Sequence, residues 1–259
     1  MSDLSARAQT LLDLHTAPEI LTLTNVWDVV SATVVAGTPG VRALATASHS
    51  IAATFGYADG ENIPLDLHLD MVGRIVAAVD LPVTMDFEAG YGDPGATARR
   101  AIEVGVVGGN LEDQMRPLDQ AVAAVEAVLA AGQAAGIDFV LNARTDAALR
   151  AGDAPRPQVL DEVVRRGRAF LAAGAPVVFV PGLVDRDEIR QVAQALGPQK
   201  LTVISVPGVS LPAHELQELG VSRVSTGPFT QRVALTALQD ATAEVVAGGV
   251  LPAGTRTLN

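Results

Sequence analysis

The sequence predicts an α/β fold, a single-domain (β/α)8 TIM barrel over residues 1–259 with an extra helix at its N-terminus. Eight short β-branched runs alternate with amphipathic segments, and about 250 residues is the usual length of such a barrel. The chain is 49% hydrophobic but only 3% aromatic, so Ala, Val, Leu and Ile must fill the core, as they do where helices cover a parallel sheet. An open doubly wound sheet is the competing fold. It is disfavoured by the count of eight units and because no glycine-rich dinucleotide turn follows the first strand.

The expected elements follow one another without a Pro/Ser-rich linker or a charge block, which indicates one domain. After a helix over Asp3–Leu14, strands are expected at Leu21–Thr24, Val41–Ala47, Pro82–Asp86, Val106–Glu112, Phe139–Arg144, Val177–Val180, Leu201–Val206 and Arg223–Thr226. The intervening helices are expected at Ser31–Gly37, Leu67–Val79, Ala96–Val104, Leu118–Ala131, Pro157–Ala173, Arg186–Leu196, Ala213–Leu219 and Phe229–Ala247. Several of them end at or next to a glycine, the preferred residue just past a helix C-terminus.

Composition excludes several kinds of chemistry and partner. A formal net charge of -11 argues against nucleic acid or an anionic membrane as the main partner. The absence of cysteine removes disulfides, thiol chemistry and zinc–cysteine sites, and the single lysine, Lys200, lies before the seventh strand, where an imine mechanism is disfavoured. No apolar run approaches the roughly 20 residues of a membrane span, and the first residues lack a secretory signal pattern. A cytoplasmic protein is therefore expected.

Polar residues gather at the ends of the first five expected strands, and the active sites of such barrels lie at the C-terminal ends of the strands. Asp86 and Glu88 are two residues apart, so on an extended strand they would share one face, and Glu112 ends the next strand. Three converging carboxylates repel one another, and a hard divalent cation such as Mg²⁺ or Mn²⁺ relieves that repulsion. Helix capping or pairing with arginines is the alternative interpretation of these acids. In contrast, the sixth and seventh strands end in Pro181-Gly182 and Pro207-Gly208.

Other candidates carry weaker signals. Arg144 is suited to hold a substrate carboxylate by two hydrogen bonds, or to neutralise Glu112 or Asp113, or to do both. His49 is more simply interpreted as a surface or hydrogen-bonding residue of a loop than as an acid or base. Asp28 is predicted to cap a helix. The remaining residues of note are interpreted as bystanders (His15, His68 and His214) or as a weak phosphate signal without a neighbouring cation (Gly208 and Gly227).

Two motifs, Asp86-Phe-Glu-Ala-Gly-Tyr-Gly92 and Asn110-Leu-Glu-Asp-Gln114, resemble the isocitrate lyase / phosphoenolpyruvate mutase superfamily. The similarity extends over most of the chain and includes Asn25–Asp28, Ala45–Ser48, Phe55–Gly60, Asn142–Asp146 and Gly220–Gly227. The resemblance implies a barrel that binds Mg²⁺ at its mouth together with 2-oxo acids or their enolates. It also implies a homo-oligomer, either a dimer or a tetramer.

The resemblance also implies roles for individual residues. Asp86 resembles the direct metal ligand, which also contacts the substrate, with Glu88 and Glu112 holding metal-bound waters. Asp59 resembles the acid that anchors those waters and the substrate, so Asp59, Glu112 and Arg144 are the expected catalytic residues. Arg144 resembles the arginine that binds the substrate carboxylate, and the segment Thr46, Ala47 and Ser48 falls where backbone amides and a hydroxyl hold its other oxygen.

The sequence departs from the family at four places. The lyases of the family carry a Cys-Gly-His loop, and this chain has no cysteine. The segment Asp113–Pro117 is short and lacks the lysine of the mutase and hydrolase gating loop. Glu88 replaces the commoner aspartate, and Phe87 is bulkier than the usual residue. Finally, we expect too little chain after the last helix for the extra C-terminal helix that family members exchange between subunits.

The leading hypothesis is a Mg²⁺-dependent carbon–carbon lyase or decarboxylase acting on a 2-oxo or 2-hydroxy di- or tricarboxylate through an enolate. It would be similar to isocitrate or methylisocitrate lyase or to an oxaloacetate decarboxylase. A phosphonopyruvate C–P bond enzyme is disfavoured by the missing lysine. A protein that binds 2-oxo acids with little or no turnover is the alternative from another class. For the general acid or base, Tyr91, His49 and a metal-bound water all stay open.

Overall fold

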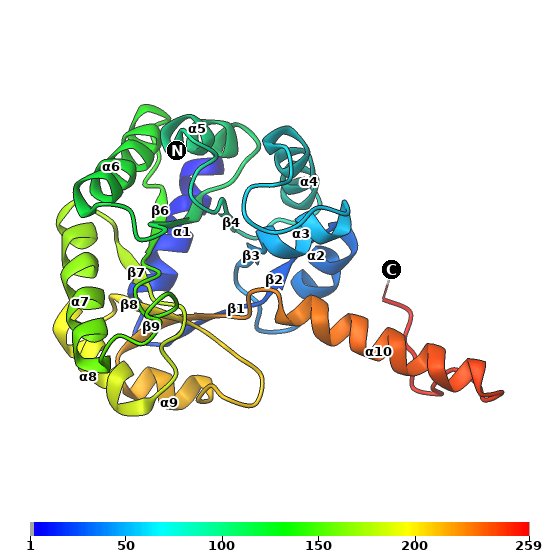
Figure 1. Cartoon of the computed structure of the whole chain (residues 1–259). Helices are drawn as coiled ribbons and strands as arrows, with labels where there is room; N and C mark the ends of the chain where they lie inside the picture. Colours follow the sequence, from blue (N-terminus) through cyan, green and yellow to red (C-terminus); the bar gives the residue numbers. More distant parts are fainter. Residues whose placement is uncertain (1–2, 259) are drawn as a thin grey trace.

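A computed structural model describes residues 3–258, so residues 1–2 and 259 of the predicted domain lie outside the described part. There, nine parallel strands form one sheet in the order β1-β9-β8-β7-β6-β5-β4-β3-β2, wrapped into a nearly closed barrel and surrounded by helices (Figure 1). The strands are β1 (Leu21–Leu23), β2 (Asn25–Val26), β3 (Leu44–Thr46), β4 (Val83–Asp86), β5 (Gly108–Glu112), β6 (Val140–Arg144), β7 (Val177–Phe179), β8 (Leu201–Ile204) and β9 (Val221–Ser225). The predicted single-domain barrel is confirmed.

The first barrel strand is split into two short pieces, which is why nine strands are found where eight were predicted. β1 pairs with β9, whereas β2 pairs with β3, so the chain changes partner at Thr24. The side chain of Asn25 bridges the two neighbours: its Nδ2 donates to the carbonyl of Thr46 at 2.8 Å, and its Oδ1 accepts from the amide of Gly227 at 2.8 Å. These bonds hold β3 and the loop after β9 together at the C-terminal end of the barrel.

The helices confirm the predicted alternation. They are α1 (Asp3–Thr16), α2 (Val29–Ala36), α3 (Ser48–Thr54), α4 (Leu65–Ala77), α5 (Pro94–Glu103), α6 (Leu118–Ala134), α7 (Arg156–Ala172), α8 (Arg186–Leu196), α9 (Ala213–Glu218) and α10 (Phe229–Val246). As predicted, Asp28 caps α2, accepting a hydrogen bond from the amide of Ser31 at 2.7 Å. Helix α1 packs against the first residue of β5, where Leu11 fits over Gly108, and so covers the N-terminal end of the barrel.

Two differences from the prediction affect the mouth of the barrel, whereas the other boundaries shift by a few residues. The second expected strand begins at Leu44 and not at Val41, and residues 48–54 form α3 instead of the expected loop. Periodicity cannot reveal a helix of only seven residues, and Ala47 at its N-cap makes no side-chain capping bond that the sequence could signal. The consequence is that Ser48 and His49 lie on the first turn of a helix at the mouth of the barrel.

Helix α10 extends away from the barrel (Figure 1). Only Gln231 of this helix is buried; its side chain donates to the carbonyl of Ser50 at 3.1 Å. The rest exposes large apolar side chains to solvent: Val233, Leu235, Leu238, Val245 and Val246. No further helix follows α10 up to residue 258. Within the described residues, no helix combines the length and the apolar character that a membrane crossing requires.

Candidate active site

A cavity of about 550 Å³ opens at the C-terminal ends of the barrel strands. Four acidic side chains line it together with a partly buried arginine: Asp59, Asp86, Glu88, Glu112 and Arg144. These are the residues that the sequence predicts for metal binding and catalysis, and they come from the ends of four strands (β3, β4, β5 and β6) or the loops after them. The predicted Ala47 and Ser48 also line the cavity, whereas Thr46 is fully buried and is not among the lining residues.

Asp86 ends β4 and is held from two sides. Its Oδ2 accepts a hydrogen bond from the hydroxyl of Ser48 at 2.9 Å, and its backbone amide donates to Oγ1 of Thr46 at 3.2 Å. Thr46 and Ser48, predicted as substrate contacts, therefore both fix the position of Asp86. This arrangement leaves Oδ1 of Asp86 with only a long contact, 3.4 Å, to the amide of Glu88.

Glu88 reaches the cavity by a different route from the predicted one. The strand ends at Asp86, and Glu88 takes a left-handed backbone conformation with φ 51°, so the two carboxylates do not share the face of an extended strand. Oε2 of Glu88 accepts from the amide of Glu61 at 2.5 Å, and Oε1 is buried without a hydrogen-bond partner among the described residues. Burial, reinforced by the charges of Asp86 and Asp59, raises the pKa of Glu88 to about 8.

Glu61 is a site residue that the sequence reasoning missed. Its Oε1 accepts from the amides of Ala89 at 3.1 Å and Tyr91 at 2.6 Å, which ties the loop after α3 to the loop after β4. The ring of His68 contacts the hydroxyl of Tyr91 at 2.9 Å, and burial lowers the pKa of His68 to about 4. Tyr91 is not among the residues that line the cavity. No motif signals this network, because it depends on where two loops meet.

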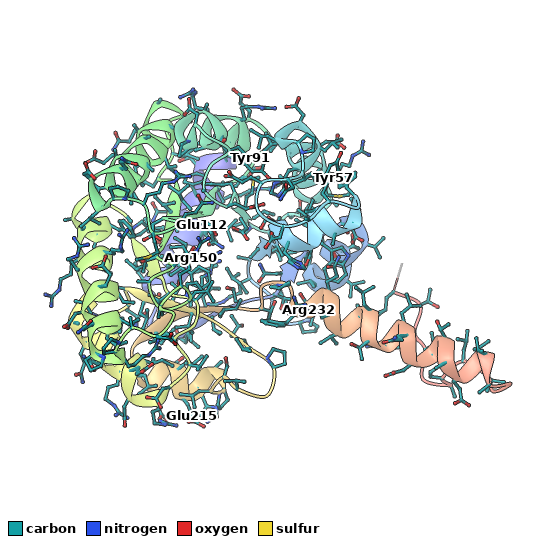
Figure 2. The ribbon with its side chains drawn as sticks, viewed as in Figure 1. Tyr57, Tyr91, Glu112, Arg150, Glu215 and Arg232 are labelled. Atoms are coloured by element: carbon teal, nitrogen blue, oxygen red, sulfur yellow. The ribbon has the colours of Figure 1, made fainter. Side chains whose placement is uncertain are left out.

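Arg144, at the end of β6, is the cation of the site. Its Nη1 lies 2.8 Å from Oε2 of Glu112, and its Nε lies 2.8 Å from Oδ1 of Asp146. Burial disfavours its charged form, but Glu112, Asp146 and Asp86 outweigh this and raise the pKa of Arg144. Burial raises the pKa of Glu112, and the charge of Arg144 opposes that shift. Figure 2 shows Glu112 and Arg150 inside the ring of helices.

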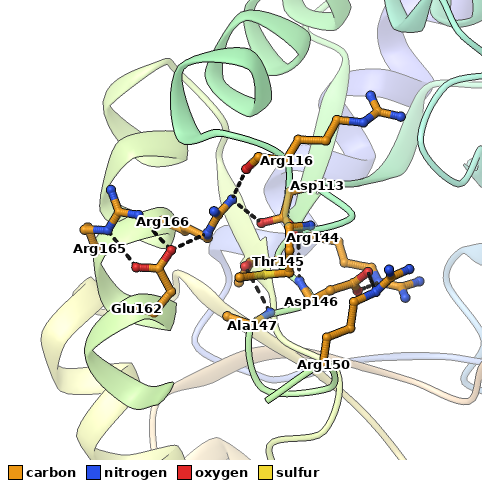
Figure 3. Close-up of polar contacts among 11 residues, drawn as sticks. Asp113, Arg116, Arg144, Thr145, Asp146, Ala147, Arg150, Glu162, Arg165 and Arg166 are labelled. Carbon is orange, nitrogen blue, oxygen red and sulfur yellow. Dashed lines mark hydrogen bonds and ion pairs between the residues drawn. The ribbon is translucent and has the colours of Figure 1, made fainter. Parts of the chain in front are cut away.

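Asp113 takes no part in neutralising Arg144, which was one of the two predicted pairings. Its Oδ2 lies 3.1 Å from Nη1 of Arg166, and the same nitrogen donates to the carbonyl of Arg116 at 3.0 Å (Figure 3). Its Oδ1 accepts from the amide of Asp146 at 3.0 Å. The segment after β5 is thereby fastened to α7 and to the end of β6.

His49 lines the cavity from the first turn of α3. Its Nδ1 is buried, and no hydrogen-bond partner is found for it among residues 3–258. The prediction of a loop histidine at the surface was therefore wrong in its placement. A short helix after β3 turns this side chain toward the site.

A divalent cation fits the residues at the mouth. Within residues 3–258, no group of three or more histidine, aspartate and glutamate side chains is arranged to hold a metal ion by itself. The buried Oε1 of Glu88, which has no hydrogen-bond partner among the described residues, instead offers a free oxygen ligand beside the other acids of the cavity. Mg²⁺ commonly keeps several waters and uses only one or two protein carboxylates, which suits this set of acids.

A parallel barrel with acids and an arginine at the C-terminal ends of its strands has the layout of a TIM-barrel enzyme. Comparison with known families narrows this class: residues 11–246 match the model of the phosphoenolpyruvate phosphomutase family, and the chain belongs to that family. It lies in the phosphoenolpyruvate mutase/isocitrate lyase superfamily, so the resemblance seen in the sequence is confirmed.

Several relatives are similar over most of their length. A Burkholderia cenocepacia protein, provisionally described as a phosphonomutase, has a crystal structure that superposes with a TM-score of 0.85 at 39% identity, covering 95% of this chain and 100% of that one. The uncharacterized protein Rv1998c of Mycobacterium tuberculosis is 30% identical over 243 residues, 93% of this chain and 90% of its own. The oxaloacetate decarboxylase of Paraburkholderia xenovorans is 28% identical over 249 residues, 90% of this chain and 80% of its own.

Proposed function

We propose that this protein is a Mg²⁺-dependent carbon–carbon lyase or decarboxylase that acts on a 2-oxo or 2-hydroxy di- or tricarboxylate through an enolate, with Mn²⁺ as an alternative ion. The observation that carries the proposal is the convergence of Asp59, Asp86, Glu88 and Glu112 on one cavity that also holds Arg144. Similarity to an oxaloacetate decarboxylase supports this class of reaction.

The proposed metal site follows from the contacts of the acids. Asp86, oriented by Ser48, would bind the ion directly, and Glu88 and Glu112 would bind through water. When bound, the ion supplies Lewis-acid polarisation of the 2-oxo oxygen. The deprotonated form of Glu88 is the one that can hold a cation, so the cluster and the ion would form a charge-balanced unit.

Arg144 has the contacts expected of a carboxylate-binding residue. Glu112 and Asp146 hold two of its nitrogens at 2.8 Å, which fixes the plane of the guanidinium before substrate arrives. A substrate carboxylate held in that plane would place the breaking bond perpendicular to the π system of the developing enolate. Ala47 and Ser48 would hold the other carboxylate oxygen, and Asp59 would orient water at the exposed rim.

His49 is the best-supported candidate for the general acid or base. It lines the cavity and its Nδ1 has no partner within residues 3–258, whereas Tyr91 contacts His68 away from the lining. This residue would compensate for the absent cysteine of the related lyases. A water at the proposed metal site is the remaining candidate.

A 2-oxo acid binding protein with little turnover is the second candidate, and the segment Asp113–Pro117 favours it. Arg166 fastens both Asp113 and the carbonyl of Arg116, so this segment has less freedom to close over a substrate than a gating loop requires. The segment carries no lysine, which disfavours the third candidate, a phosphonopyruvate C–P bond enzyme.

We infer a homo-oligomer, a dimer or a tetramer, in which α10 packs on a second copy. The exposed apolar side chains of α10 support this, since a helix of a monomer rarely exposes so many. In that arrangement α10 itself would be the exchanged helix.

The proposal is tested by turnover of a panel of 2-oxo and 2-hydroxy acids, oxaloacetate among them, with and without Mg²⁺. We expect metal-dependent cleavage of at least one, and its loss in Glu112→Ala. Calorimetric binding of the same panel distinguishes the candidates. Tight, Mg²⁺-dependent binding without any cleavage would favour the binding protein over the lyase.

A further inference from the structure

The cavity has two chemically different halves. The acids and Arg144 occupy the side formed by β3 to β6, and six apolar side chains gather on the opposite side, which also carries Asn25, Ser225 and Arg232. We call these six side chains the apolar wall; it consists of Leu149, Phe179, Pro181, Ile204, Val206 and Phe229. These residues come from the loop after β6, from the ends of β7 and β8 and the loops after them, and from the start of α10.

Close packing builds the apolar wall. Gly227 has φ 52°, and a Cβ placed there would lie 2.6 Å from Cδ1 of Ile204, so the isoleucine leans over a position where only glycine leaves room. In the same way, a Cβ on Gly182 would lie 3.2 Å from the amide of Leu149, so the loop after β6 rests on that glycine. The wall is a formed surface and not a chance group of exposed side chains.

The backbone behind the wall offers few polar groups to a ligand. The hydroxyl of Ser210 accepts from the amide of Val206 at 2.7 Å and contacts the carbonyl of Ile204 at 3.2 Å. The amide of Ser205 is bonded to the carbonyl of Ser225 at 2.8 Å. These backbone groups next to Ile204 and Val206 are therefore bonded within the protein, and the side chains of Ile204 and Val206 line the cavity.

The cations around the wall are also mostly engaged. Arg150 pairs with Asp146 at 3.1 Å, and Arg144 pairs with Glu112 and Asp146. Among the arginines that line the cavity in the described part of the chain, Arg232 alone has no ion pair. It lies exposed at the start of α10, with its guanidinium 5.2 Å from the ring centre of Phe229 (Figure 2). A carboxylate against the wall would lose its water without gaining a partner, unless it reached Arg232 at the rim.

We propose that the substrate carries an uncharged alkyl group that packs against the apolar wall, opposite its 2-oxo or 2-hydroxy carboxylate. This inference rests on the proposed function, which assigns the carboxylate end to Arg144 and the metal. The hydrocarbon gains by leaving water, and the cavity is large enough for several carbon atoms beyond the carboxylate end. The same wall disfavours a charged group placed against it, so among the di- and tricarboxylates of the proposed function it favours those whose carboxylates lie toward Arg144 and the metal and whose remaining branch is alkyl.

The test is calorimetric binding to the full chain in Mg²⁺, first of pyruvate, 2-oxobutyrate and 2-oxopentanoate. We expect the affinity to rise about fourfold for each added methylene, which is roughly 15-fold across the series. The matched pair 2-oxopentanoate and 2-oxoglutarate, which differ only in a terminal methyl or carboxylate, should favour the first by about tenfold or more.

Variants connect the selectivity to the wall. Val206→Thr keeps the side-chain shape but replaces a methyl group by a hydroxyl, so it should reduce the gain in affinity per methylene. The control Val209→Thr, on the exposed part of the same loop, should leave that gain unchanged. Equal affinities along the series, or tighter binding of 2-oxoglutarate that Arg232→Gln abolishes, would overturn the apolar assignment. If none of these 2-oxo acids, 2-oxoglutarate and oxaloacetate included, shows Mg²⁺-dependent binding, the proposed function itself fails.

Discussion

The guanidinium of Arg144 lies 2.8 Å from the carboxylate of Glu112, and both groups line the cavity at the barrel mouth. Each side chain therefore affects the other, through the pKa of Glu112 and the orientation of Arg144. The charge of Arg144 opposes the rise that burial causes in the pKa of Glu112. In turn, Glu112 helps to orient the guanidinium group that would bind a substrate carboxylate. Asp146 holds a second nitrogen of the same guanidinium at 2.8 Å.

Glu112→Gln tests the role of this pair in metal binding. The variant keeps the size of the side chain but removes its charge, so we expect Mg²⁺ affinity to fall by about 10- to 100-fold, the usual cost of losing a group that supports a metal-bound water. Calorimetric titration with Mg²⁺ in the presence of pyruvate measures it. The control is Glu103→Gln, an exposed change at the end of α5, and equal affinities in the two variants would exclude Glu112 from the metal site.

The pKa of Glu88, raised to about 8, predicts how Mg²⁺ affinity depends on pH. Below that value the carboxyl holds a proton that the cation must displace, so affinity should increase as pH rises from 6 to 8, by up to about tenfold per pH unit, and level off above. Glu88→Gln should flatten the profile. A wild-type affinity that does not change over this range would contradict the assignment.

The same pKa sets the sign of a stability change in the metal-free protein. The folded state holds a proton on Glu88 between about pH 4.5 and 8, while the unfolded state does not. The free energy of unfolding contributed by this group should therefore decrease as pH rises through that range. Urea denaturation of wild type and Glu88→Gln at pH 5 and pH 8 measures this change. From pH 5 to pH 8, the free energy of unfolding of the wild type should fall relative to that of the variant.

Phe87, the bulky residue next to Asp86, is accommodated by a glycine on the neighbouring strand. A Cβ on Gly109 would lie 2.1 Å from Cε1 of Phe87, so Gly109→Ala should destabilise the protein by about 1–3 kcal/mol. Phe87→Ala removes the ring, and in that background Gly109→Ala should cost much less. Chemical denaturation of the double-mutant cycle measures the coupling, and strictly additive losses would show that the two residues do not share the space.

The proposed packing of α10 on a second copy can be tested by placing charges on this helix. Leu235→Glu combined with Leu238→Glu places two charges on its exposed apolar side chains, and we expect the oligomer to dissociate into monomers in sedimentation experiments. Gln239→Glu, a charge added at an exposed polar position of the same helix, should leave the oligomer intact. If the wild type sediments as a monomer, the proposed packing of α10 on a second copy is wrong.

The sequence predicted most of the fold because its signals are local. Alternating β-branched runs and amphipathic segments located the helices and strands to within a few residues, and helix α8 was predicted with its observed bounds. The split of the first strand at Thr24 could not be foreseen. It depends on the hydrogen bonds of Asn25 with residues about 20 and 200 positions away.

The candidate site was predicted in composition but not in its internal contacts. The acids and Arg144 were located from the ends of strands, which converge in any parallel barrel. Glu61, Asp146 and helix α3 were missed, because a left-handed residue, an ion pair two positions from the strand end and a seven-residue helix leave no periodic pattern. The apolar wall was visible only as the absence of polar residues after the sixth and seventh strands.

A crystal structure grown with Mn²⁺ and a 2-oxo acid, with the ion located by its anomalous signal, tests the central claim most directly. The account predicts one ion at the barrel mouth, bound to Asp86 directly and to Glu88 and Glu112 through water, with the ligand carboxylate on Arg144. An empty mouth at saturating Mn²⁺, or an ion bound elsewhere while Glu112 contacts only Arg144, would contradict it.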